Sequence, residues 1–372
     1  MKILLVFGTR PEAIKMCPLV LELAKVADFE VKVCVTAQHR EMLDQVLNIY
    51  EIEPDYDLNL MRNNQTLEWL TGAIIEGVGD VIKEFAPQLV LVHGDTTTSF
   101  AAALAAFYQK VDVGHVEAGL RTGDIKSPWP EEANRKLTAT LSTLHFAPTE
   151  SSKNNLLNEG ILASKIHVTG NTVIDSLFQA IDIIKKDSFK ESAVISSLKK
   201  ELGAQKVILI TGHRRENFGP SFENICLALK EIAITNPDCH LVYPVHLNPM
   251  VQKPVFNHLG SLSNVHLIAP LDYLSFVSLM DRADIILTDS GGIQEEAPSL
   301  KKPVLVLREK TERPEAVKAG TVQLIGTNKS TIVKAVTELL DNSELFESQQ
   351  NPYGDGLACQ RIVNIIREEY EL

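Results

Sequence analysis

Short apolar runs alternate along the chain with longer segments in which apolar residues recur every three or four positions. Such runs are typical of strands buried in a parallel sheet, and such segments are typical of the helices that cover one. The first half of the chain alternates in this way from residue 2 to residue 169. Its predicted strands are 2–7, 31–36, 89–93, 111–116, 144–147 and 166–169, and its predicted helices are 14–26, 39–49, 67–85, 97–108 and 150–158.

The alternation starts again after a change-over near Gly170. A helix is predicted over 172–186, and a charged, weakly apolar stretch follows it to Gly203. The later predicted strands are 207–211, 240–244, 265–268, 284–287, 304–307 and 322–325, and the later helices are 222–235, 249–259, 273–281, 330–340 and one that begins at Ile293. A turn-rich segment at 351–356 precedes a last helix at 357–370.

This order of elements predicts the α/β class, with parallel, doubly wound sheets and right-handed crossovers. A chain of 372 residues is longer than one core usually covers. We therefore expect two Rossmann-like domains, at 1–170 and 171–356, and a terminal helix at 357–372 that crosses back to the first. Two such domains facing each other form a cleft at the carboxyl ends of their strands, where sheets of this kind bind ligands.

Composition excludes several classes of function. The net charge of −12 argues against nucleic acid or an anionic membrane as the main partner. The five cysteines are scattered and form no CxxC pair, which predicts a reduced, cytoplasmic protein without a zinc site. The apolar run at the N-terminus is too short for a signal peptide or a membrane span, so we expect a soluble protein. No GxGxxG follows the first strand, so a dinucleotide cofactor is not predicted.

The segment TDSGGIQEEAP at 288–298 is the clearest candidate for a binding site. Ser290, Gly291 and Gly292 follow a predicted strand and open a helix, which leaves backbone N–H groups and the positive end of the helix dipole available to a diphosphate. An ordinary βα turn that uses glycine for its geometry is the alternative. The Glu296 carboxylate would repel phosphate but can accept both hydroxyls of a ribose, which favours a nucleotide.

Cationic side chains follow other strands. Arg10 and Lys15 flank a predicted helix start, where cations oppose the dipole, so we favour phosphate binding over a plain surface role. His213 follows the first strand of the second half and can donate to phosphate, although a structural histidine is the alternative. Arg313 stands just before Pro314 at a helix start and is a further partner for a phosphate or a carboxylate.

Three carboxylates are predicted to converge in the first half. Asp95 follows a strand at the N-cap position of the next helix, Glu117 ends another strand, and Glu131 opens a helix. Taken alone, Asp95 is better explained as a plain N-cap, and interaction with the helix dipole explains Glu131 equally well. Grouped carboxylates raise one another's pKa, which suits acid–base chemistry, or they hold a divalent metal.

These motifs together resemble one family. The matching segments include FGTRPEAIKM (7–16), HGDTTTS (93–99), GHVEAGLRTGD (114–124), PEEANR (130–135), GHRRENFG (212–219), TDSGGIQEEAPSL (288–300) and TERPEAV (311–317). In order and over nearly the whole chain, they are similar to the bacterial non-hydrolysing UDP-N-acetylglucosamine 2-epimerases. The resemblance implies the fold of the B-type glycosyltransferases. It also implies a homodimer that interconverts UDP-N-acetylglucosamine and UDP-N-acetylmannosamine for surface polysaccharides, without metal or nicotinamide cofactor.

The resemblance also assigns roles to residues. It implies that UDP binds to Arg10, His213, Ser290, Gly291, Gly292, Glu296 and Arg313, with Phe276 and Leu271 at the uracil pocket. Leu271 stands where some relatives have Gln. Lys15, Asp95, Glu117 and Glu131 match the active-site positions of the family. Gln38, His39 and Arg215 match a second site, where some members bind UDP-N-acetylglucosamine as an activator.

The family reaction eliminates UDP across C1–C2 to 2-acetamidoglucal and adds it back with the C2 proton on the other face. We expect Asp95 and Glu131 to transfer the proton and Glu117 to assist the developing cation, while His213 and the arginines stabilise the leaving UDP. The alternative functions are those of a hydrolysing epimerase that releases N-acetylmannosamine and UDP, a retaining glycosyltransferase and a non-catalytic UDP-sugar sensor.

Overall fold

The chain forms two compact units, each built on its own parallel sheet. A computed structural model describes residues 1–37, 40–62, 65–186, 189–341 and 349–372. Unit 1 comprises residues 1–179 and 353–372, and unit 2 comprises residues 180–352. The division after residue 179 falls inside a helix, α7 (Thr172–Ile184), rather than at the glycine turn before it. No helix of the described residues is long and apolar enough to cross a membrane.

Unit 1 contains a seven-stranded sheet in the order β3-β2-β1-β4-β5-β6-β7, with every neighbouring pair parallel. Its strands are β1 (Lys2–Phe7), β2 (Glu30–Val35), β3 (Tyr56–Asp57), β4 (Leu89–His93), β5 (Asp112–Val116), β6 (Leu144–Ala147) and β7 (Ile166–Val168). Strand β1, inside this sheet, is buried on both faces. Ile3, Leu5 and Phe7 enter one core, and Leu4 and Val6 enter the other.

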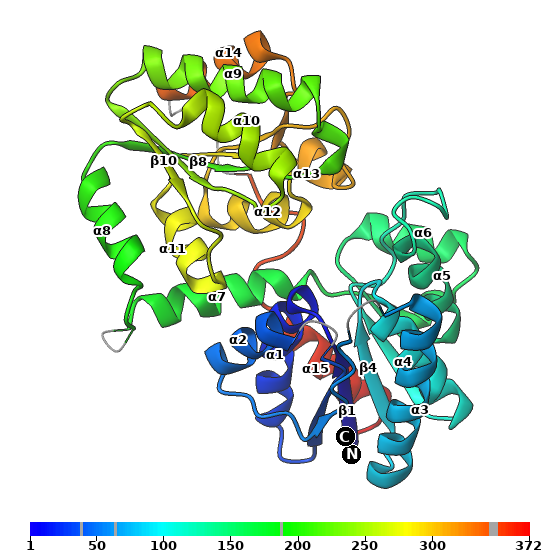
Figure 1. Cartoon of the computed structure of the whole chain (residues 1–372). Helices are drawn as coiled ribbons and strands as arrows, with labels where there is room; N and C mark the ends of the chain where they lie inside the picture. Colours follow the sequence, from blue (N-terminus) through cyan, green and yellow to red (C-terminus); the bar gives the residue numbers. More distant parts are fainter. Residues whose placement is uncertain (38–39, 63–64, 187–188, 342–348) are drawn as a thin grey trace. The chain divides into compact units, whose positions relative to one another are not determined.

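Helices cover both faces of this sheet (Figure 1). They are α1 (Arg10–Ala24), α2 (Arg40–Ile49), α3 (Leu67–Phe85), α4 (Thr97–Tyr108), α5 (Glu131–Leu141), α6 (Glu150–Asn158), the start of α7 and α15 (Ala358–Glu369), with a 3-10 turn, η1, at Ala163–Lys165. The terminal helix α15 places Cys359, Ile362 and Ile366 in the same core as α1, so the end of the chain is part of unit 1.

Unit 2 contains a six-stranded parallel sheet in the order β10-β9-β8-β11-β12-β13. Its strands are β8 (Lys206–Thr211), β9 (Cys239–Pro244), β10 (Val265–Ile268), β11 (Ile285–Thr288), β12 (Val304–Val306) and β13 (Gln323–Leu324). Its helices include the end of α7, α8 (Ala193–Leu202), α9 (Pro220–Thr235), α10 (Pro249–Leu259), α11 (Tyr273–Arg282), α12 (Gly291–Glu296), α13 (Pro314–Lys318) and α14 (Lys329–Asp341), with 3-10 turns η2 (Arg215–Asn217) and η3 (Ala297–Leu300).

The predicted α/β class and doubly wound sheets are confirmed, and several local predictions are wrong. The charged stretch before Gly203 holds helix α8, which buries Ile195, Leu198 and Leu202. The helix predicted from Ile293 begins two residues earlier, at Gly291, with Ser290 as its N-cap. The short strand β3 lies in a region where the apolar pattern predicted no element.

Both sheets reverse their strand order beside the first strand of the unit. In unit 1, β1 lies between β2 and β4, and in unit 2, β8 lies between β9 and β11. Helices that follow the two sides of such a reversal run on opposite faces of the sheet, which leaves a crevice outside the carboxyl ends of the strands. Several candidate residues follow the strands on the two sides of each reversal: Arg10 comes after β1 and Asp95 after β4, and His213 comes after β8 and Ser290 after β11.

Candidate active site

The turns after β1 and β4 are joined by a buried carboxylate. Glu12, in the first turn of α1, accepts hydrogen bonds from the Gly8 and Thr9 amides at 3.0 and 2.8 Å. Its other oxygen accepts from the Thr96 and Ser99 hydroxyls at 2.6 and 3.1 Å. Burial raises the pKa of Glu12, and hydrogen bonds from Thr96, Thr9 and Gly8 oppose that rise. Glu12 was not among the predicted site residues, and it fixes the turn that carries Arg10 at the start of α1.

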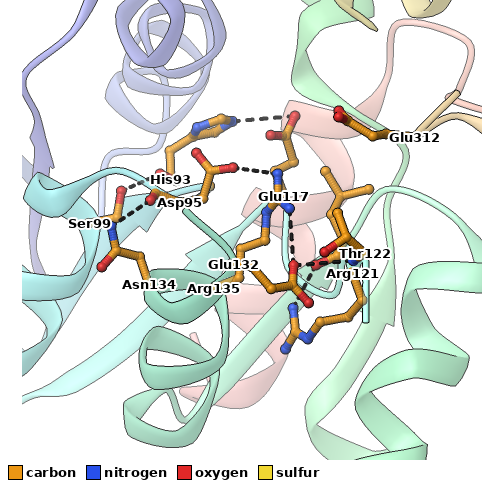
Figure 2. A network of polar contacts seen from close by, with 12 residues as sticks. His93, Asp95, Ser99, Glu117, Arg121, Thr122, Glu132, Asn134, Arg135 and Glu312 are labelled. Carbon is orange, nitrogen blue, oxygen red and sulfur yellow. Dashed lines mark hydrogen bonds and ion pairs between the residues drawn. The ribbon is translucent and has the colours of Figure 1, made fainter. Parts of the chain in front are cut away.

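Asp95 is held by the first turns of helix α5 rather than by helix α4. The N-cap of α4 is Thr96, so the prediction that Asp95 occupies this position is wrong by one residue. The Asp95 carboxylate pairs with Arg135 Nη2 at 2.6 Å, and its backbone carbonyl accepts from the Asn134 amide at 2.9 Å (Figure 2). Asp95 therefore points its carboxylate at a fixed cation beside the β4 turn.

Glu131 and Glu132 have different environments although they are neighbours. Glu131 begins α5 and is half-buried, whereas Glu132 is fully buried. Glu132 pairs with Arg135 at 3.2 Å and accepts from the Thr122 and Gly123 amides at 3.2 and 3.3 Å. In the motif PEEANR, Glu132 and Arg135 lie three residues apart and therefore share a helix face, which indicates that they can pair. Their other partners lie outside the motif.

Glu117 lies directly after β5 with a left-handed backbone, at φ +62°. Few residues other than glycine adopt this conformation, and it persists only where the surroundings enforce it. The Glu117 carboxylate forms an ion pair with Lys15 and accepts from the Asn171 amide nitrogen at 2.7 Å. The structure therefore places Lys15 and Glu117 in contact, although 102 residues separate them in the sequence.

A buried histidine completes the surroundings of Glu117. His93 Nε2 lies 3.8 Å from Glu117 Oε2, and Figure 2 shows the ring directed toward this carboxylate. Burial lowers the pKa of His93 to about 4, so the ring is neutral at pH 7. Among the described residues, no group of three or more His, Cys, Asp or Glu side chains is arranged to hold a metal ion.

In unit 2, Asp289 fixes the turn after β8. Its carboxylate is fully buried and accepts from the His213 and Arg214 amides at 2.9 and 2.8 Å. The half-exposed His213 ring stacks on His246, with the ring centroids 5.3 Å apart. Partial burial lowers the pKa of His213, while Asp289 opposes this effect. The imidazole is thus a neutral donor or acceptor at the end of β8.

Arginines surround the start of helix α12. A Cβ atom placed on Gly291 would lie 3.7 Å from the Arg214 guanidinium and 3.8 Å from that of Arg313. Arg313 is itself positioned by an ion pair with the buried Glu295. Two guanidinium groups and the first amides of a helix form a strongly positive environment, and a glycine leaves room beside it for an anion.

The remaining predicted ligands of the nucleotide belong to α11, to α12 and to the segment before α11. Glu296 is 8% exposed and accepts a hydrogen bond from the Tyr273 hydroxyl at 3.2 Å. Phe276, in α11, and Leu271, two residues before this helix, are half-buried. Of the predicted activator residues, Arg215 is exposed in η2, and Gln38 and His39 lie outside the described residues.

Comparisons with known proteins agree over nearly the whole chain. The family model for UDP-N-acetylglucosamine 2-epimerase matches residues 21–367. The UDP-N-acetylglucosamine 2-epimerase of Escherichia coli K12 is 58% identical, with 99% of this chain and 98% of the relative covered. The corresponding enzyme of Neisseria meningitidis serogroup A is 56% identical, with 98% of this chain and 99% of the relative covered.

Solved structures of enzymes from the same family are also similar to this chain. The Neisseria meningitidis enzyme bound to UDP-GlcNAc superposes with a TM-score of 0.87 at 55% identity, covering 99% of this chain and all of the other. The Methanocaldococcus jannaschii enzyme in complex with UDP-GlcNAc and UDP has a TM-score of 0.80 at 36% identity, with 99% and 100% covered. The chain therefore belongs to the UDP-N-acetylglucosamine 2-epimerase family.

Proposed function

We propose that this protein interconverts UDP-N-acetylglucosamine and UDP-N-acetylmannosamine without hydrolysing either. The observation that carries the proposal is full-length similarity to a relative that was solved with UDP-GlcNAc bound. The geometry supports it, because unit 1 has carboxylates paired with cations directly after β4 and β5, and unit 2 has an arginine-lined helix start directly after β11.

Unit 2 would bind the UDP part of the substrate. Arg214, Arg313 and the amides at Gly291 would hold the diphosphate, and His213 would donate to it. Glu296 would accept the ribose hydroxyls, with Tyr273 keeping its carboxylate in place. The uracil would lie against Phe276 and Leu271. We also assign Arg10 as a cation for the leaving diphosphate.

The chemistry must avoid direct ionisation at C2, because no carbonyl lies next to that carbon. A base removes the C2 proton while the bond between C1 and the UDP oxygen breaks, and UDP leaves with the electron pair. This step gives 2-acetamidoglucal. In the return step the UDP oxygen attacks C1 and an acid delivers a proton to the opposite face of C2. Closure around the intermediate would exclude water and prevent its loss.

We assign the proton transfers to Asp95 and Glu131 and the stabilisation of positive charge at C1 to Glu117. Arg135 would keep the Asp95 carboxylate in one orientation. Lys15 would do the same for Glu117, so that its charge is available at a fixed point. Preorganised charge of this kind lowers a barrier because it needs no rearrangement when the transition state forms.

Incorporation of deuterium tests the reaction directly. Incubation with UDP-N-acetylglucosamine in heavy water should place deuterium at C2 of both nucleotide sugars, and the products should remain attached to UDP. Free N-acetylmannosamine would instead identify a hydrolysing enzyme. Binding without any deuterium at C2 would identify a sensor and refute the proposal.

Three variants test the assigned carboxylates. Asp95→Asn, Glu117→Gln and Glu131→Gln should each reduce kcat by about 100-fold or more, since removing one charge from a preorganised site typically has this effect. Their Kd for UDP, measured by calorimetry, should stay near the wild-type value, because UDP is assigned to other residues. Glu68→Gln, on the exposed first turn of α3, is the matched control. Near-normal turnover in all three variants would refute the assignment.

We further propose that the protein works as a homodimer and that its product supplies surface polysaccharide synthesis. Light scattering of the purified protein tests the first part. A deletion strain that keeps its surface polysaccharide would contradict the second.

A further inference from the structure

We infer that Asn171 is a positioning residue for the reaction, because it joins the start of helix α7 to the Glu117 carboxylate. This inference rests on the proposed function, since it concerns the same carboxylate. Asn171 is 2% exposed and stands directly before Thr172, the first residue of α7. None of the roles assigned above uses it.

The oxygen and the nitrogen of the Asn171 side-chain amide form hydrogen bonds with different partners. Its oxygen accepts from the Val173 amide at 3.1 Å, which is the capping interaction of a helix N-terminus. Its nitrogen donates to Glu117 Oε2 at 2.7 Å. A side chain that only capped the helix would need just an acceptor, and serine or aspartate would serve as well. The donor half of the amide is therefore explained by Glu117.

The backbone of Asn171 is fixed as firmly as its side chain. Its amide donates to the Tyr353 carbonyl at 2.7 Å, at the point where the chain returns to unit 1. The preceding Gly170, at φ +88°, packs so closely that a Cβ atom there would lie 3.2 Å from the Tyr353 oxygen. Two segments that are distant in the sequence thus hold the donor in place beside Glu117.

Glu117 depends on such support because its backbone is in the left-handed region. Lys15 forms an ion pair with the carboxylate, but a lysine ammonium on a flexible stem does not fix the orientation of the carboxylate. The Asn171 amide is planar and short, so it defines the orientation of Oε2. A misplacement of about 1 Å in a catalytic group can reduce the rate about 100-fold.

Two substitutions separate the helix cap from the contact with Glu117. Asn171→Ser keeps an acceptor for Val173 and loses the donor to Glu117. It should lower kcat about 10- to 100-fold, a range set by misplacement of one group. Its Kd for UDP and its urea midpoint should stay near the wild-type values. Asn264→Ser is the matched control, because the Asn264 amide donates only to the backbone carbonyls of Ala233, Asn236 and Cys239 in the contacts described for it. That variant should lose stability and keep its kcat.

Asn171→Asp gives a readout that a structural role would not produce. The new carboxyl group faces Glu117. The other ionisable side chains beside the Glu117 carboxylate are Lys15 and the neutral His93. Two ionised carboxylates repel each other, whereas one shared proton restores a hydrogen bond. The kcat of this variant should therefore be lower than that of Asn171→Ser at pH 8 and should recover as the pH falls to 6.

Hydrogen exchange separates failure of this inference from failure of the proposed function. In Asn171→Ser, exchange over 117–123 should be faster than in the wild type, and exchange at the start of α7 should not change. Wild-type kcat together with unchanged exchange would overturn the inference. If the wild-type protein places no deuterium at C2, the proposed function fails, and the exchange of 117–123 still decides whether Asn171 positions Glu117.

Discussion

At the scale of single residues, the candidate site is built on charges that are buried and paired. Arg313 is 9% exposed, and its partner Glu295 is fully buried. Such a pair is a weak source of stability as a whole, but removal of one partner leaves the other charge in a poorly solvated place. The same reasoning applies to Arg135 between Asp95 and Glu132.

Arg313→Met should therefore destabilise unit 2 strongly. We expect a loss of about 3–5 kcal/mol in the free energy of unfolding, the usual effect of breaking a buried pair. Arg313→Lys keeps a cation and should lose less. Lys83→Met breaks the exposed pair with Asp80 and should change stability by less than about 0.5 kcal/mol. Urea unfolding followed by circular dichroism measures all three, and equal losses for Arg313→Met and Lys83→Met would contradict the argument.

The sequence could predict residues whose position on an element already indicates chemistry. Glu117 after a strand and Ser290 before a helix were found in this way, and the structure places each where the pattern indicated. Glu12, Glu132, Arg135 and Asn171 were missed because each resembles a capping or surface residue until its distant partner is known. For Asn171 that partner is 54 residues away in the sequence.

At the scale of elements, buried side chains also fix helix ends. The terminal helix α15 has no side-chain cap of its own, and Asp175 of α7 takes that role. Its carboxylate accepts from the Ala358 and Cys359 amides at 3.2 and 2.9 Å. Burial raises the pKa of Asp175, and these hydrogen bonds oppose the rise.

Asp175→Ala should cost about 1–2 kcal/mol, as loss of a helix cap typically does. The loss should be accompanied by faster hydrogen exchange in the first turn of α15. Asp355→Ala is the matched control, because Asp355 lies at the same helix start but is an exposed partner of Arg361. We expect a change below about 0.5 kcal/mol for this control. The argument fails if the two variants lose the same stability.

Element prediction succeeded where the apolar spacing was strong and failed where charges diluted it. The helix α3 was predicted with its observed ends, since Thr66 caps it and Pro87 follows its C-terminus. Helix α8 was missed among lysines and glutamates, although Ile195, Leu198 and Leu202 recur at helical spacing. Its N-cap, Ser192, was a further signal that the composition of the stretch obscured.

At the scale of the whole molecule, the repeated order of strands and helices was sufficient to predict two doubly wound sheets. Both sheets have the strand order of the Rossmann fold, 3-2-1-4-5-6, with one more strand in unit 1. The pattern could not predict where the chain divides between the two units, because α7 is one continuous helix that contributes to both. Periodicity identifies a helix but not the core against which each of its turns packs.

Among its described residues, unit 1 has three buried histidines that make its stability depend on pH. Burial lowers the pKa of His93 and His145 to about 4 and that of His115 to about 3, from an ordinary value of 6.5. Between these values and 6.5 the unfolded chain binds more protons than the folded unit, so stability rises with pH and is lost as the pH falls. Each histidine contributes a slope of at most about 1.4 kcal/mol per pH unit.

We therefore expect unit 1 to lose stability steeply between pH 6.5 and 5 and to change little between pH 7 and 8. Both tryptophans of the chain, Trp69 and Trp129, belong to unit 1, so their fluorescence during urea unfolding reports on this unit alone. His115→Gln and His145→Gln should each flatten the acid slope, since glutamine does not titrate. His258→Gln, in unit 2, should leave that slope unchanged. A wild-type slope in both of the unit 1 variants would show that other groups control the acid sensitivity of the fold.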